Sequence, residues 1–282
     1  MDALDFTLLG CDFTSAPSRR KPVILALGHV DRGRVVLEGL ETIDTLDAWA
    51  VRLADVGAGP WVGGFDLPFG LPRELVTSLG WPTNWLPCIR QYAHLGREEI
   101  RAVFAAFCET RPVGGKFAHR ATDGPAGSSP SMKWVNPPVA FMLHAGVPRL
   151  VDAGVSLPGL HEGDPNRIAL EAYPGLLARS VLGKASYKSD DKAKQTPERL
   201  IARRTLIEAL ESGRPRVLSE TGLRLKLSHA QRDRLADDPS GDTLDAVLCL
   251  LQAAWALVQH RSGHPCWGLP PFDALEGWIV TA

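Results

Sequence analysis

The chain has 282 residues, of which 45% are hydrophobic and 22% are charged, and its formal net charge is −1. These values are typical of a globular protein and exclude a disordered chain, and the length suffices for one large α/β domain or two small ones. Because the net charge is close to zero, no global basic field favours nucleic-acid binding, so a nucleic-acid enzyme of this composition needs a local basic patch.

The five cysteines are scattered, odd in number and never spaced as CxxC. This spacing predicts neither a disulfide framework nor a zinc cage, and it favours the reducing environment of the cytoplasm. No stretch reaches the roughly 20 apolar residues that span a bilayer, so we expect no membrane partner. Nothing in the composition indicates an oligomeric state.

The first 66 residues have the pattern of a strand meander, a helix and a further strand. Residues 31–33 (Asp-Arg-Gly) are typical of a tight hairpin, which predicts that the first three strands are antiparallel. Asp12 closes the first strand and Asp66 follows the fourth, at a sheet edge where α/β proteins tend to bind ligands. We expect strands over residues 6–12, 23–30, 34–43 and 61–65, and a helix over residues 44–54.

Residues 75–160 interrupt this α/β pattern. Residues 98–108 carry the apolar stripe of an amphipathic helix, and residues 139–155 suggest more helix or irregular structure. Residues 111–138 are rich in Gly, Pro and Ser and predict a long loop, and loops of that length inside compact domains are usually functional or disordered. We therefore expect one domain over residues 1–282, with a mainly helical and loop insertion at about 75–160.

The remaining chain returns to regular structure. We expect a strand over residues 167–172 that carries Glu171, a helix over residues 176–182, a helix over residues 197–210 with Ile201 on its buried face, and a long final helix to about His260. The predicted class is α/β, with a mixed sheet flanked by helices in which the first three strands are antiparallel and the later strands are parallel.

Acidic residues recur at the ends of the predicted elements: Asp12, Asp66 and Glu171 on strands, and Asp242 and Asp245 at the start of the last helix. Two-metal phosphoryl chemistry needs several carboxylates around ions about 3.5–4 Å apart, and Mg²⁺ prefers oxygen ligands. Asp242 and Asp245 are three residues apart, which places them on one helical face. Helix capping, with Asp242 as N-cap, is an equally open role for that pair.

Basic side chains in polar segments offer contacts to phosphate. Arg120 and Lys133 lie in the long loop and can order on a substrate backbone, and Lys188 lies between a Tyr and a Ser in a polar segment. For Lys188, simple solvent exposure is an equally open role.

These residues and the motifs around them resemble those of a known group of proteins. Asp12 in the first strand, Asp66 in GFDLPFGLP and the helix start DTLDA resemble the RNase H-like superfamily, and RuvC-type resolvases in particular. More closely, the chain is similar to the domain-of-unknown-function family four-twenty-nine, whose members are predicted nucleases with an RNase H fold. The matching pieces are GCDFTSAPSRRK, GFDLPFGLP, HRATD (residues 119–123), LEAYPGLL (residues 170–177), YKS (residues 187–189) and GDTLDAVLC.

The resemblance implies an RNase H-like mixed sheet and a Mg²⁺ or Mn²⁺ site whose ligands are Asp12, Asp66 and Asp245. Asp242 stands where RuvC-type enzymes place a helper residue, three positions before the last ligand. The insertion at about 75–160 is longer than we expect for the family.

The resemblance also marks further site residues: Glu171 beside the carboxylates as a catalytic candidate, and Arg120, Asp123 and Lys188 as candidates for substrate binding. With Lys133, these residues complete the predicted site.

Three functions are compatible with this pattern. The first is a metal-dependent nuclease that hydrolyses phosphodiester bonds in DNA or RNA. The second is a nucleotide-binding or phosphotransferase-like protein on the same sheet, which the turn at residues 12–15 (Asp-Phe-Thr-Ser) resembles; such proteins need two domains, each with a Gly-rich phosphate turn, whereas this chain has one acidic strand-turn. The third is a catalytically silent binding module, which the fold alone does not distinguish from an enzyme.

Overall fold

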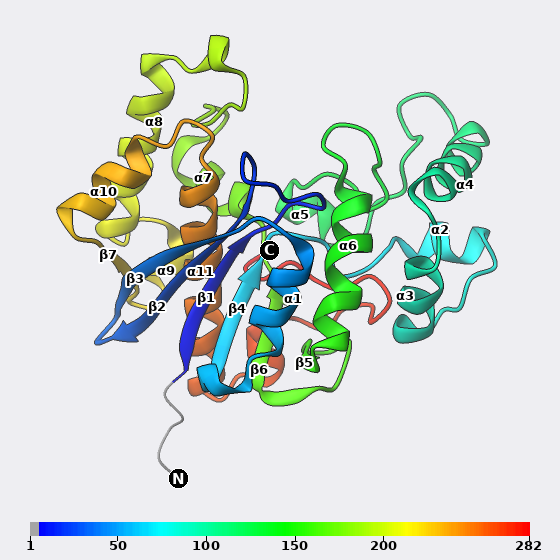
Figure 1. The fold of residues 1–282 in the computed structure, drawn as a ribbon, viewed down its shortest axis with the longest axis horizontal. Coiled ribbons are helices and arrows are strands. Elements are labelled where there is room, and N and C mark those ends of the chain that lie inside the picture. Colours follow the sequence, from blue (N-terminus) through cyan, green and yellow to red (C-terminus); the bar gives the residue numbers. More distant parts are fainter. Residues whose placement is uncertain (1–5) are drawn as a thin grey trace.

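The structure is a computed structural model that describes residues 6–282. These residues form an α/β fold with a seven-stranded mixed sheet in the order β5-β6-β4-β1-β2-β3-β7, flanked by helices (Figure 1). The strands are β1 (Thr7–Asp12), β2 (Val23–Asp31), β3 (Arg34–Ile43), β4 (Trp61–Phe65), β5 (Val155–Ser156), β6 (Asp164–Glu171) and β7 (Arg224–Lys226). The expected class, an α/β mixed sheet flanked by helices, is confirmed.

The centre of the sheet follows the expected pairing. Strands β1, β2 and β3 are antiparallel, and the tight turn between β2 and β3 places Arg32 and Gly33 at φ angles of 47° and 77°. Glycine adopts positive φ without strain, which explains its place in this turn. On the other side of β1, strands β4 and β6 are parallel to it and to each other. The carboxyl ends of β1, β4 and β6 therefore lie along one edge of the sheet.

Helices cover both faces of the sheet, and each face has its own buried apolar cluster. One cluster joins the sheet to α7, α8, α10 and α11, and the other joins it to α1, α3, α4 and α6 (Figure 1). The helices are α1 (Leu46–Ala54), α2 (Arg73–Ser78), α3 (Trp85–Ala93), α4 (Arg97–Glu109), α5 (Asp123–Ala126), α6 (Val139–Asp152), α7 (Pro174–Leu182), α8 (Pro197–Glu211), α9 (Arg216–Ser219), α10 (His229–Ala236) and α11 (Asp242–Arg261).

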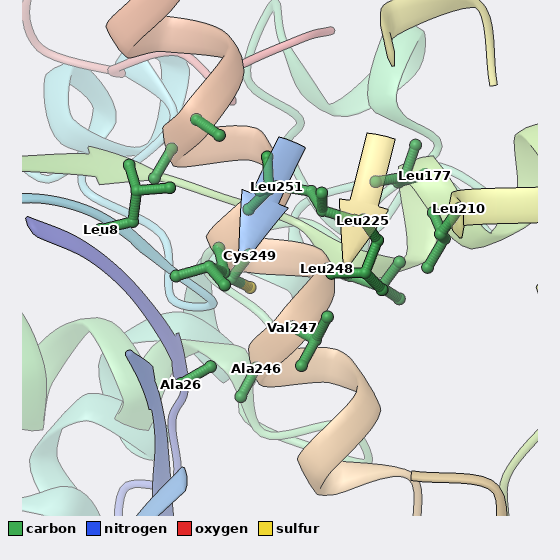
Figure 2. Packing of buried hydrophobic residues seen from close by; sticks show 14 of the residues in the cluster. Leu8, Ala26, Leu177, Leu210, Leu225, Ala246, Val247, Leu248, Cys249 and Leu251 are labelled. Atoms are coloured by element: carbon green, nitrogen blue, oxygen red, sulfur yellow. The ribbon is translucent and has the colours of Figure 1, made fainter. Parts of the chain in front are cut away.

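Helix α11 lies directly on the middle of the sheet. A Cβ added to Gly10 in β1 would lie 2.0 Å from the carbonyl oxygen of Ala246, and one added to Gly64 in β4 would lie 2.4 Å from that of Cys249. Figure 2 shows the apolar side chains of α11 packed among those of the strands and of the neighbouring helices, including Leu8 and Leu225. The two glycines thus allow the backbone of α11 to contact β1 and β4.

The stretch between β4 and β6 is mainly helical and loop, as the sequence predicts, and it packs on the face opposite α11. Residues 139–152 form one continuous helix, α6, although Pro148 lies inside it. The loop that precedes α6 contains the short helix α5.

Several features differ from the sequence predictions. Strands β5 and β7 and helix α10 were not expected, because each is short or has no clear apolar period. Ile201 is 62% exposed, not buried, because the core face of α8 is formed by residues such as Ala202 and Leu206. Helix α11 is long and apolar enough to meet the criterion for a membrane span, whereas the sequence analysis predicts no such stretch. However, 72% of the most apolar window of α11 is buried in the fold, as in the core helix of a globular protein.

Candidate metal centre

Four carboxylates from three separate segments meet at one edge of the sheet. Side chains alternate along a strand, so Asp12 at the end of β1 points to the same face as Gly10, which contacts α11. Asp66 follows β4 and its backbone N–H donates to the carbonyl of Cys11 at 2.9 Å, which holds it beside the end of β1. Asp242 and Asp245 lie in the first turn of α11. We call Asp12, Asp66, Asp242 and Asp245 the carboxylate cluster.

The start of α11 is capped by Asp238, outside the cluster. One oxygen of Asp238 accepts a hydrogen bond from the N–H of Thr243 at 2.9 Å, and the other accepts from the N–H of Ser240 at 3.0 Å and of Gly241 at 3.2 Å. Gly241 is the N-cap residue, with φ of 77°, so Asp242 is the first helical residue. The capping role that the sequence left open for Asp242 is therefore filled by Asp238.

Asp245 is completely buried, and both of its oxygens accept hydrogen bonds. The hydroxyl of Tyr187 donates to Oδ1, and Nζ of Lys188 donates to Oδ2. The side chain of Lys188 is 41% exposed, so the amine reaches a buried carboxylate from the surface. Its stem packs on Gly241, where an added Cβ would lie 2.7 Å from Cβ of Lys188. Lys188 thus supplies positive charge to the cluster while keeping a path to solvent.

Burial and the neighbouring carboxylates raise the pKa of Asp12 and of Asp66. Desolvation and the charge of Asp245 raise the pKa of Asp66 to about 7, against a lowering by Lys188. Desolvation, followed by the charges of Asp245, Asp242 and Asp66, also raises the pKa of Asp12 well above its usual range. Burial and like charges held together both oppose ionisation, so these shifts follow from the burial of the carboxylates and from their convergence. Desolvation would lower the pKa of Lys188, but the carboxylates of Asp245 and Asp12 raise it above its ordinary value.

A second lysine lies beside the cluster. Nζ of Lys21, just before β2, forms an ion pair with Asp190 at 2.7 Å, and its charge lowers the pKa of Asp242 against the effect of desolvation. This ion pair joins the turn after β1 to the segment that carries Lys188. Lys21 and Lys188 therefore bring positive charge to the carboxylate cluster from two different segments of the chain.

Glu171 belongs to a different network. At the end of β6 it accepts from both terminal nitrogens of Arg120 at 2.7 and 2.8 Å, and from the N–H of Phe69 at 2.8 Å. Arg120 also donates to Asp123 and to the carbonyl of Glu276. The side chains of Arg120, Asp123 and Glu171 are at most 3% exposed. This network ties the long loop, β6 and the C-terminal segment together.

The residues predicted to bind substrate therefore lie in different parts of the structure. Lys188 contacts the carboxylate cluster, whereas Arg120 donates all five of its side-chain N–H groups to Asp123, Glu171 and the carbonyl of Glu276. The side chain of Lys133 makes no hydrogen bond or ion pair with any residue in the range 6–282. Arg120, Asp123 and Glu171 thus bond to one another in the fold, and the catalytic and substrate-binding roles expected for them from the sequence stay predictions.

The carboxylate cluster fits a hard divalent cation in donor type and charge, because all of its donors are oxygens and its negative charge exceeds that of the nearby lysines. Within residues 6–282, however, no group of three or more His, Cys, Asp or Glu side chains is arranged to hold a metal ion as it stands. Asp245 is instead engaged by Tyr187 and Lys188. A cation that binds Asp245 would therefore compete with the amine of Lys188 for that carboxylate.

No protein-family model, curated protein or solved structure matches this chain. The fold and the cluster together define an α/β protein with a carboxylate-rich site at the edge of a mixed sheet. The assignment of an activity rests on that geometry.

Proposed function

We propose that this protein is a divalent-metal-dependent nuclease of the RNase H-like type, which uses Mg²⁺ or Mn²⁺ to hydrolyse phosphodiester bonds. The observation that carries the proposal is the carboxylate cluster, in which Asp12, Asp66 and Asp245 come from separate segments to one sheet edge, and in which burial and acidic neighbours raise the pKa of Asp12 and Asp66. A buried cluster of like charges is costly for folding, and perturbed pKa values of this kind concentrate at functional sites.

The layout of the sheet supports the RNase H-like assignment. The resemblance implies antiparallel first strands, parallel later strands, and ligands on the first strand, after the fourth strand and on the last helix. Strands β1–β4 and helix α11 have this arrangement. The resemblance in motifs and the strand order therefore agree.

In this proposal Asp12, Asp66 and Asp245 hold the metal, and Asp242 lies beside them as a further carboxylate. The bound ion would supply an activated water and stabilise charge on the scissile phosphate. Lys188 offsets the negative charge of the cluster, and an amine that leaves Asp245 would be free to contact the phosphate. Lys21 also interacts electrostatically with Asp242 and Asp12, and it provides a second positive charge.

The phosphotransferase alternative is less well supported. It needs two sheet domains, each with a Gly-rich phosphate turn, whereas the strands of residues 6–282 form one sheet. A catalytically silent binding module has no need for acidic residues that lie close together. Each buried carboxylate of the cluster that lacks a compensating charge would lower the stability of such a protein.

The test is calorimetric titration of Mn²⁺ into the wild type, Asp12→Asn and Asp47→Asn, with cleavage assays on single-stranded, duplex, hybrid and branched nucleic acids. Asp47 is an exposed residue of α1 and serves as the matched control. We expect wild type and Asp47→Asn to bind Mn²⁺ and to cut at least one substrate, and Asp12→Asn to do neither. Metal binding without cleavage of any substrate would contradict a nuclease, and a wild type that binds no metal would overturn the metal site.

A further inference from the structure

A cavity of about 140 Å³ lies beside the carboxylate cluster and shares Asp66 with it. Its walls come from the turn after β4, the loop before α6, the start of α6 and the segment after β6. Besides Asp66, the lining includes Ser129, Pro137, Val139, Met142 and Tyr173. No single stretch of sequence contains these residues, so no motif marks this cavity.

The volume suits one small ring. An apolar cavity of about 150 Å³ accepts benzene, so a cavity of 140 Å³ matches the size of a single six-membered ring. Pro137, Val139 and Met142 offer apolar surface to the faces of such a ring.

The polar groups that line the cavity differ in whether they are free to bond to a ligand. Arg120 and Glu171 also line the cavity, but their hydrogen bonds are used within their own network. The hydroxyl of Ser129 makes no hydrogen bond with any residue in the described range, so it is available to the polar edge of a ligand. The cavity thus has apolar walls, one free hydroxyl and a carboxylate, Asp66, at the side of the metal site.

We propose that this cavity is a base pocket, which takes the single-ring base, a pyrimidine, of the nucleotide whose phosphate lies at the carboxylate cluster. This inference rests on the proposed nuclease function and names its substrate class. A base enters a pocket only after it leaves the duplex stack, which is least costly where the nucleotide is already unpaired. The substrates are therefore single strands, frayed ends or unpaired pyrimidine nucleotides, and continuous duplex is a poor substrate.

The test uses Val139→Phe, which fills the cavity without altering a carboxylate. Val139 is half-buried at the start of α6, and the matched control is Val113→Phe at a loop position that is 94% exposed. The probes are uridine 5′-monophosphate, adenosine 5′-monophosphate and inorganic phosphate, each titrated in the presence of Mn²⁺. Ser129→Phe, from the other wall, is the second variant if Val139→Phe does not fold.

We expect wild type and Val113→Phe to bind the uridine nucleotide more tightly than the adenosine nucleotide. Val139→Phe should weaken uridine nucleotide binding about tenfold or more, the scale of losing a packed base, while Mn²⁺ and phosphate binding stay unchanged. Unchanged uridine nucleotide affinity in a folded, Mn²⁺-binding Val139→Phe, or tighter binding of the adenosine nucleotide by wild type, would overturn the base pocket and leave the nuclease proposal intact. A wild type that binds no Mn²⁺ would overturn both proposals.

Discussion

Gly10 and Ala246 are in backbone contact: a Cβ on Gly10 would lie 2.0 Å from the carbonyl oxygen of Ala246 and 2.3 Å from the N–H nitrogen of Leu250. This contact sets how closely α11 approaches β1. Asp12 lies two residues beyond Gly10, and Asp245 immediately precedes Ala246. The spacing between these two carboxylates is therefore set by main-chain packing, with little freedom for the side chains to change it.

The first prediction concerns this contact. Gly10→Ala should lower the free energy of unfolding by about 3 kcal/mol or more, because a methyl group cannot fit without moving α11 away from the sheet. Gly39→Ala in β3 is the control, since a Cβ there meets no atom within 4 Å. Chemical denaturation of both variants measures the difference. A cost for Gly10→Ala that matches the control would show that α11 does not press on β1.

The strand meander and α11 could be predicted from the sequence because local patterns specify them. Alternation of apolar residues, the Asp-Arg-Gly turn and a long apolar helical stripe are properties of contiguous residues. Strand β7 was missed since it has three residues and pairs with β3 across a large sequence separation. Ile201 was misplaced because a small residue, Ala202, takes the buried position of its turn.

The second prediction separates the two acids at the start of α11. Asp238→Ala should cost about 1–2 kcal/mol of stability, because it removes the acceptor of the Thr243, Ser240 and Gly241 N–H groups. Asp242→Ala should be neutral or slightly stabilising in metal-free buffer, since the pKa of Asp242 is raised by desolvation and by its acidic neighbours. Thermal unfolding of both variants tests this order. The reverse order would return the capping role to Asp242.

The third prediction is a dependence of stability on pH without metal. The folded state raises the pKa of Asp66 from 3.8 to about 7. Between pH 4 and pH 7 the folded protein therefore holds more protons than the unfolded chain, so the free energy of unfolding falls as the pH rises. Asp66→Asn should match wild type near pH 4 and exceed it at pH 8 by about 1–3 kcal/mol, a range that allows for partial solvent access. Denaturation in EDTA at both pH values measures this gap, and a constant difference would refute it.

The fourth prediction concerns the buried ion network. Arg120→Met should lower stability by about 3–5 kcal/mol, because it leaves the carboxylates of Asp123 and Glu171 buried and unpaired. Arg120→Lys should fail to restore it, since one amine cannot replace the five donors of a guanidinium. Arg90→Met, which breaks the exposed pair with Asp152, is the control and should cost less than about 1 kcal/mol. Equal losses at the two arginines would mean that the network is not structural.

The fifth prediction concerns Lys188. Lys188→Gln should bind Mn²⁺ more tightly than wild type, because the amine no longer competes for Asp245, and it should cut nucleic acid more slowly, because a phosphate contact is lost. Lys184→Gln, at a nearby exposed position, is the control. Calorimetry and initial cleavage rates measure the two effects. Weaker Mn²⁺ binding in Lys188→Gln would mean that the lysine supports the ion and does not exclude it.

The candidate site was predictable where residues lie at the ends of elements. Asp12, Asp66 and Asp245 stand at recognisable boundaries, and parallel neighbours bring such boundaries together. The sequence could not show that Glu171 points to the face opposite Asp12, because that depends on the register of β6 in the sheet. Nor could it show that Arg120 pairs with Glu171, 51 residues further along the chain.

The contact of Lys188 with Asp245 joins a buried core helix to a connecting segment that is exposed on either side of residues 187–189. Asp245 belongs to a helix whose middle is buried against the sheet, and backbone amides there should exchange with solvent only when the whole fold opens. Residues 183–186 and 190–198 are exposed, so amides in these flanking stretches should exchange through local fluctuations. Lys188 itself lies between two anchors, because the carbonyl of the buried Tyr187 accepts from Arg203 and the N–H of Ser189 donates to the carbonyl of Pro239. An ion would therefore reach the carboxylates through movement of the long Lys188 side chain, while the positions of Asp12 and Asp245 persist for the lifetime of the folded state.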